Sequence, residues 1–97
     1  MGESSRNESV SVGAAAVSVS LPKNGRRAVV YLTNTGATTI TVCMSGSQAC
    51  TAGAGIVLLP GGFISDSVSE GYMPYQGEIN AIGSGAGGTL GVYERIA

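Results

Sequence analysis

Apolar and polar residues alternate along much of the chain with a period of two. Residues 17–21 place three apolar side chains on one face and two serines on the other. Residues 38–44 alternate in the same way, with Ile40, Val42 and Met44 pointing in one direction. Because consecutive side chains of a strand point to opposite faces, this alternation predicts strands with one buried face. No stretch keeps a period of about 3.6 residues over several turns, so no long helix is predicted.

One run departs from the alternation. Residues 28–32 are apolar throughout, which is typical of a strand covered on both faces. The other apolar runs predict strands at residues 56–59, 63–68, 78–82 and 89–96, with a short edge strand at residues 10–12.

Turn-forming residues separate these runs. Asn24-Gly25 follows Pro22, and an Asn-Thr-Gly sequence at residues 34–36 closes the apolar run. Pro60-Gly61 predicts a type II turn, because proline sets φ for its first central position and glycine supplies the positive φ of the second. About seven to eight short strands punctuated in this way predict an all-β fold, a single small antiparallel β-sandwich or jelly-roll-like barrel.

The length of 97 residues suits one domain, which we divide into a polar N-terminal arm at residues 1–9 and a β-sandwich at residues 10–97. Charged residues make up only 11% of the chain, and five Lys and Arg face six Asp and Glu. Such a balance attracts no polyanion, so nucleic acid is not an expected partner. A weakly charged surface of this kind suits packing against other protein.

Residues 1–9 lack the apolar stretch of a signal peptide, so we expect no secretion by the ordinary route. No apolar run approaches the roughly 20 residues of a membrane helix, so a membrane is not an expected partner either.

Cys43 and Cys50 flank a short polar loop. The favoured interpretation is a disulfide that closes this loop, and the alternative is a pair of free thiols. A metal site is not expected, because the chain has no histidine and no further cysteine. A disulfide without a signal peptide suits a protein that leaves the cell by lysis inside a particle.

The chain has few residues that are suited to catalysis. Without histidine a Ser or Cys nucleophile lacks its usual base, and Lys23 is the one lysine. The carboxylates are scattered, and each is interpreted as solvated or salt-bridged. Residues 83–88 match the G-x-G-x-x-G pattern, but the pattern needs a following helix and a strand is predicted here. We therefore expect neither an enzyme nor a cofactor.

Three segments are candidates for protein contacts. The arm contributes Glu3, Arg6 and Glu8, and a strand entry carries Arg26 and Arg27. An arginine pair at such a place caps a turn and faces water, or meets the carboxylates of a partner. The third segment, residues 71–77, puts Tyr72, Met73 and Tyr75 between glycines. It is either a contact loop, since aromatic residues and Met are enriched at interfaces, or a loop that covers the end of the sandwich.

Three stretches taken together resemble a known family. They are Arg26 to Gly36, Leu58 to Gly62 and Gly77 to Ile82, followed by a final strand from Thr89 to Glu94. Their order is similar to that of small β-sandwich virion proteins of tailed bacteriophages, of the capsid decoration (cement) type. The resemblance implies a structural protein, made in the host cytoplasm and bound to the capsid surface. It also implies the major capsid protein as partner and a homo-oligomer, a trimer in many members.

Two other functions stay open. One is a tail- or fibre-associated module that binds carbohydrate or a receptor, for which Tyr72 and Tyr75 would form the platform. The other is a further structural subunit of a head or coat.

Overall fold

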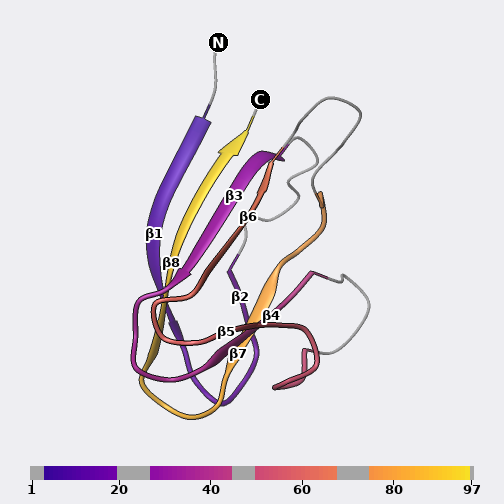
Figure 1. The fold of residues 1–97 in the computed structure, drawn as a ribbon. Helices are drawn as coiled ribbons and strands as arrows, with labels where there is room; N and C mark the ends of the chain where they lie inside the picture. Colours follow the sequence, from indigo (N-terminus) through magenta and orange to yellow (C-terminus); the bar gives the residue numbers. More distant parts are fainter. Residues whose placement is uncertain (1–3, 20–26, 45–49, 68–74, 97) are drawn as a thin grey trace.

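Two four-stranded antiparallel sheets face each other in the computed structural model, which describes residues 4–19, 27–44, 50–67 and 75–96 (Figure 1). The first sheet has the order β1-β8-β3-β6 and the second the order β2-β7-β4-β5. The bounds of the eight strands are β1 (Ser4–Val12), β2 (Val17–Ser18), β3 (Arg27–Asn34), β4 (Ile40–Cys43), β5 (Ile56–Leu58), β6 (Phe63–Ser67), β7 (Asn80–Gly83) and β8 (Gly88–Ile96).

The strand pairs are nested along the chain. β1 pairs with β8, β2 with β7, β3 with β6 and β4 with β5, and successive pairs alternate between the two sheets. The pairs β3·β8 and β4·β7 then join the nested pairs within each sheet. A long hairpin wrapped in this way is a jelly roll, so the predicted all-β sandwich is confirmed.

The core lies between the sheets and is formed by aliphatic side chains of both. Fully or almost fully buried members are Val12, Val19, Val30, Leu32, Ile40, Val42, Leu58, Ile79, Ala81, Leu90 and Val92. Within each strand these residues are the alternate positions whose side chains point into the core. The period of two in the sequence therefore predicted where the strands are. The strands at residues 17–18, 40–43, 56–58, 63–67 and 88–96 fall within or beside the predicted ranges.

β1 differs from the expectation of a short edge strand preceded by an arm. It begins at Ser4 and pairs with β8 over its whole length, from Ser4 opposite Ile96 to Val12 opposite Gly88. Residues 4–9 are therefore part of the first sheet. The polar composition hid this, because the inward phase of this half of β1 carries Arg6 and Glu8 in place of apolar side chains.

β3 also differs from its prediction, because only one of its faces is covered. Val30 and Leu32 are buried, whereas Tyr31 on the opposite face is 39% exposed. The outer face of the first sheet is not covered by another described layer, so the apolar run of β3 supplies an exposed aromatic residue. A register shift between Arg27 and Val29 places Arg27 in the interior, on the same side as Val30.

Candidate functional site

A buried ionic cluster joins three strands of the first sheet. The Glu94 side chain has no exposed surface, and its Oε2 accepts a hydrogen bond from Arg27 Nε at 2.9 Å. Its Oε1 accepts from Arg6 Nη2, also at 2.9 Å. The two arginines are held further by backbone carbonyls, Arg6 by that of Val19 and Arg27 by that of Tyr75. One carboxylate thus links β1, β8 and β3 at one end of the sandwich.

This cluster changes the role assigned to the predicted interface arginine Arg27. Its side chain is completely buried, so it neither faces water nor is available to the carboxylates of a partner. The reason is the irregular register at the start of β3, which turns Arg27 inward, and the counter-charge that Glu94 provides there. Arg6 is 22% exposed and also forms an ion pair with Glu8, whose side chain is 53% exposed.

Tyr75 lies beside this cluster and helps to close the same end of the sandwich. Its ring packs partly buried against the core, its hydroxyl donates to Glu78 O at 3.0 Å, and its backbone N donates to Asp66 Oδ2 at 3.0 Å. The neighbouring Gln76 donates from Nε2 to Arg27 O and accepts from Arg27 N. At Tyr75 the loop therefore covers the sandwich. Glu3, Arg26, Tyr72 and Met73 lie outside the described residues.

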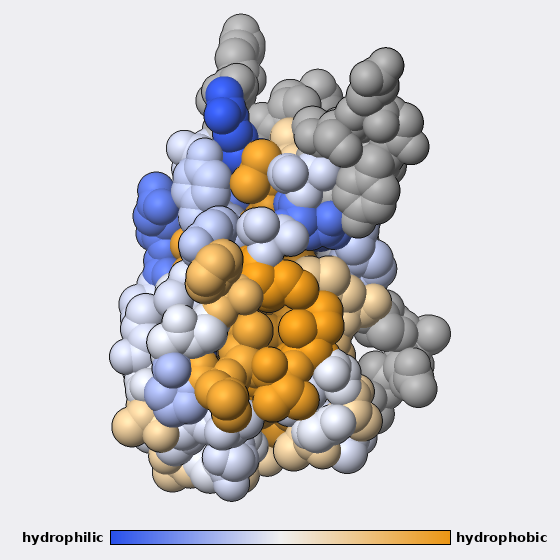
Figure 2. Space-filling view, viewed as in Figure 1, coloured by the Kyte–Doolittle hydropathy of each residue, from blue (hydrophilic) through white to orange (hydrophobic). Residues whose placement is uncertain are grey.

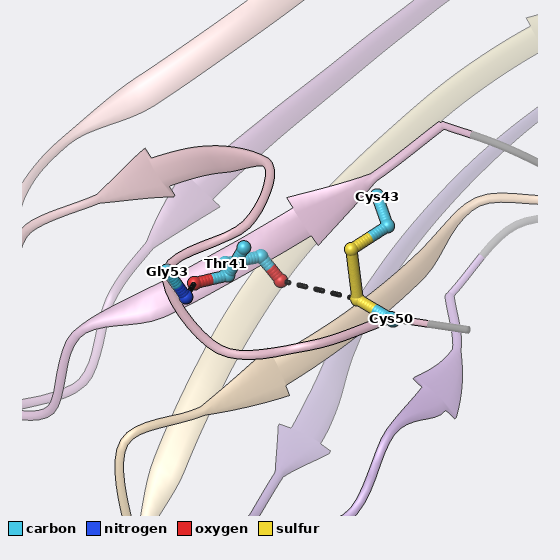
Figure 3. The surroundings of a disulfide bond; sticks show 4 residues. All are labelled: Thr41, Cys43, Cys50 and Gly53. Carbon is cyan, nitrogen blue, oxygen red and sulfur yellow. Dashed lines mark hydrogen bonds between the residues drawn. A yellow bond between two sulfur atoms is a disulfide. The ribbon is translucent and has the colours of Figure 1, made fainter. Parts of the chain in front are cut away.

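The predicted disulfide between Cys43 and Cys50 is confirmed, with 5.6 Å between the two Cα atoms (Figure 3). It ties the segment that begins at Cys50 to the outer face of β4. Gly53 N donates to Thr41 Oγ1 at 2.9 Å, and a side chain on Gly55 would meet Val42 O at only 2.7 Å. This close approach leaves Thr41 and Cys43 buried although they point away from the core. The segment that the disulfide anchors therefore covers this outer face of β4.

Exposed apolar side chains concentrate at the corner where the chain passes from the second sheet to the first. We call residues 56–64 the apolar corner. Val57, Leu59 and Phe63 are 46%, 63% and 60% exposed, and Ile56 and Ile64 are half-buried. Figure 2 shows hydrophobic surface gathered in the middle of the face on which β5 and β6 lie. Large exposed apolar patches mark surfaces that contact other molecules.

Phe63 extends this apolar surface onto the outer face of the first sheet. Its ring stacks on that of Tyr31, with 5.4 Å between centroids and an angle of 5° between planes. The two residues are on neighbouring strands, diagonal to each other in the β3·β6 register. The sequence did not predict this pair, because residues 28–32 were interpreted as a strand covered on both faces and residues 63–68 only as a further strand.

Glu94 was treated only as one of several scattered carboxylates. The alternation along β8 does indicate that Glu94 is buried. Leu90, Val92 and Glu94 point to the same face of this strand, and the first two are core residues. A charged side chain in an inward phase requires a partner of opposite charge.

No helix in the described part of the chain is long and apolar enough to cross a membrane. Within the same residues no group of three or more His, Cys, Asp or Glu is placed to hold a metal ion.

The fold and these surfaces define a small jelly-roll β-sandwich with an internal disulfide. No family model and no curated protein matches the sequence. A solved structure from a study of Bacillus endospore appendages, described as forming a novel family of disulfide-linked pili, is similar to the chain with a TM-score of 0.58. The match has 21% sequence identity and covers 99% of this chain and 87% of that one. At this identity the likeness shows a shared fold.

Proposed function

We propose that this protein is a non-enzymatic structural subunit that packs against further copies of itself in an ordered assembly. The observation that carries the proposal is the apolar corner. Val57 and Leu59 expose about half or more of their surface in a chain with only 11% charged residues. Burying such side chains against a neighbour is favourable by roughly 25 cal/mol for each Å² removed from water. With a net charge of −1, copies do not repel one another strongly.

The structural neighbour supports an assembly of this kind, since that protein forms pili. The comparison also suggests that this chain differs from its structural neighbour in how disulfide bonds are used. The sequence has two cysteines, and both are used in the bond within the chain. We therefore propose that copies of this protein associate through non-covalent contacts, with the disulfide acting inside each subunit.

Size-exclusion chromatography with light scattering, and electron microscopy of the purified full chain, test the proposal. We expect concentration-dependent oligomers or filaments that disappear in the double variant Val57→Thr/Leu59→Ser. The control is Ser9→Ala/Ser11→Ala, which alters two exposed side chains of β1 at the other edge of the first sheet. A chain that stays monomeric at about 1 mM, where even contacts of about 4 kcal/mol are half-formed, would contradict self-assembly.

The capsid decoration function is the second candidate, and the three stretches that resemble phage virion proteins favour it. It differs in its partner, because the apolar corner would then pack against a shell protein. A monomeric chain that binds purified phage capsids, and loses this binding in Val57→Thr/Leu59→Ser, would support it over self-assembly. Deleting the first nine residues is not a clean test of either function, since it would remove most of the strand that pairs with β8.

A further inference from the structure

The outer face of the first sheet carries a hollow that neither proposed function uses. Its volume is about 320 Å³, at the lower end of the range of small-molecule sites. Tyr31 and Tyr93 flank it and are directly opposite each other in the β3·β8 register. Asn7 lies opposite Tyr93 on the other side, on β1.

The hollow exists because Gly91 has no side chain. Gly91 lies on β8 between Ser9 of β1 and Thr33 of β3, and it lines the hollow. A Cβ atom on Gly91 would find its nearest neighbours, Thr35 Cγ2 and Thr33 O, at 3.6 and 3.7 Å, which are ordinary contact distances. Gly91 is also not among the described glycines with positive φ. Neither packing nor backbone conformation therefore requires glycine here, and its effect is to keep the space open.

One wall of the hollow is held in place by a second aromatic ring. Tyr31 stacks on Phe63 with nearly parallel planes, so its orientation is set by a contact outside the hollow. Tyr31 nevertheless remains 39% exposed. A tyrosine fixed in this way offers a rigid ring with an apolar body and a polar hydroxyl, and little entropy is lost when a ligand packs on it.

The polar groups of the hollow are neutral or paired. The lining residue Asn7 carries an amide, which can both donate and accept, and Thr33 and Thr35 carry hydroxyls, of which that of Thr35 donates to Thr89 O at 3.4 Å. Among the described lining residues the charged one is Glu8, and it is ion-paired with Arg6. No cation lines the hollow within the described residues, so it offers nothing to an anionic ligand such as a phosphate.

We propose that this hollow binds a neutral sugar ring of an oligosaccharide. A pyranose has an apolar C–H face that packs against an aromatic ring, and hydroxyls that exchange hydrogen bonds with amide and hydroxyl groups. Two tyrosines, one asparagine and two threonines around an open floor match both requirements. The site differs from the platform predicted at Tyr72 and Tyr75, since Tyr75 is committed to the end of the sandwich.

The test is a titration of the full, oxidised chain followed by amide chemical shifts in ¹H–¹⁵N NMR. The probes are neutral oligosaccharides of glucose, N-acetylglucosamine, mannose, galactose and xylose, each at up to about 10 mM, a range that detects binding in the millimolar region. We expect at least one of them to shift the amides of Asn7, Thr33, Gly91 and Tyr93.

Gly91→Val fills the hollow and should weaken that binding by about tenfold or more, equivalent to about 1.4 kcal/mol. The matched control, Ser65→Val, introduces the same valine side chain on the same outer face at a position that does not line the hollow. It should leave the affinity within about twofold. Thermal unfolding of each variant shows whether its fold is intact.

Three results would overturn the proposal. The first is the absence of shifts at these four amides with every oligosaccharide, and the second is equal binding by wild type and a folded Gly91→Val. The third is a shift of the same amides with protein concentration in the absence of sugar, abolished by Gly91→Val, which would make this face a contact between copies. None of these results depends on Val57 or Leu59, so the proposed self-assembly is tested separately.

Discussion

Arg27 and Glu94 form an ion pair from which solvent is excluded, with Nε and Oε2 2.9 Å apart and no exposed surface on either side chain. The pair links neighbouring strands β3 and β8, and Arg6 adds a second link from β1. A buried charge is costly to leave alone, so each member of this cluster depends on the others. The cluster therefore stabilises the sheet end at which the two longest strands begin and end.

Replacing Glu94 by glutamine should destabilise the protein by about 3 kcal/mol, because the buried Arg27 loses its counter-charge. Urea unfolding measures the change in free energy. The control Glu8→Gln removes the exposed partner of Arg6 and should cost less than about 1 kcal/mol. Equal losses of stability in the two variants would show that the buried carboxylate of Glu94 contributes no more to stability than the exposed carboxylate of Glu8.

Asn34→Asp should cost about 3 kcal/mol. Asn34 is fully buried, and its Nδ2 donates to Thr38 O and Leu58 O at 2.7 and 2.9 Å. Aspartate has nearly the same shape but cannot donate when ionised, so two carbonyls would face a buried negative charge. Asn7→Asp, at an exposed position of β1, serves as the control in the same urea experiment. A stability equal to that of the control would mean that these hydrogen bonds contribute little.

Substitution by alanine should affect stability differently at two glycines of β8. A Cβ at Gly88 would lie 2.5 Å from Val12 O and 2.7 Å from Thr38 Oγ1, so Gly88→Ala must push β1 away and should cost about 1–3 kcal/mol. Gly91→Ala meets nothing closer than 3.6 Å and should be neutral or slightly stabilising. Thermal unfolding of both variants compares them directly. A larger loss at Gly91 would contradict the open floor of the hollow.

Removing the disulfide should destabilise the protein by about 2.5 kcal/mol, from the closure of a loop between cysteines separated by 7 residues. Urea unfolding of Cys43→Ala/Cys50→Ala gives the value. Amide exchange at Gly53 should accelerate more than that at Val30, because Gly53 is held against Thr41 by the segment that the bond anchors. Reductant should destabilise the wild type and leave the double variant unchanged. An equal effect of reductant on both would show that it acts elsewhere.

The agreement between prediction and structure is greatest where one face of a strand is apolar. β4 and β8 were located to within a few residues because Ile40, Val42, Leu90 and Val92 repeat with the period of the pleat. The same rule failed for the first half of β1. There the inward positions are polar, and Arg6 is compatible with its partly buried position because Glu94 on the next strand and Val19 O accept its hydrogen bonds.

The candidate surfaces were predicted less well. Arg27 was assigned to the surface from its place beside a turn, and a shift of one residue in the register of β3 reversed its direction. Tyr31 is exposed because no other described part of the chain covers the outer face of the first sheet. The residues next to Tyr31 in the sequence do not indicate whether that face is covered. The stack on Phe63 depends on β3 and β6 being neighbours although their first residues, Arg27 and Phe63, are 36 positions apart in the chain.

The sequence by itself determined that this is a weakly charged, all-β chain, because alternation and turn residues are local properties. The close spacing of Cys43 and Cys50 favoured a disulfide over two free thiols, and the structure decided between them. Only the tertiary structure decided which side chains the alternation buries and which it leaves open. The nested strand pairing brings Arg6, Arg27 and Glu94 together, exposes the apolar corner and places Gly91 between Ser9 and Thr33, diagonal to Tyr31. These relationships depend on contacts between residues far apart in the chain, and such contacts are set by packing of the whole sandwich.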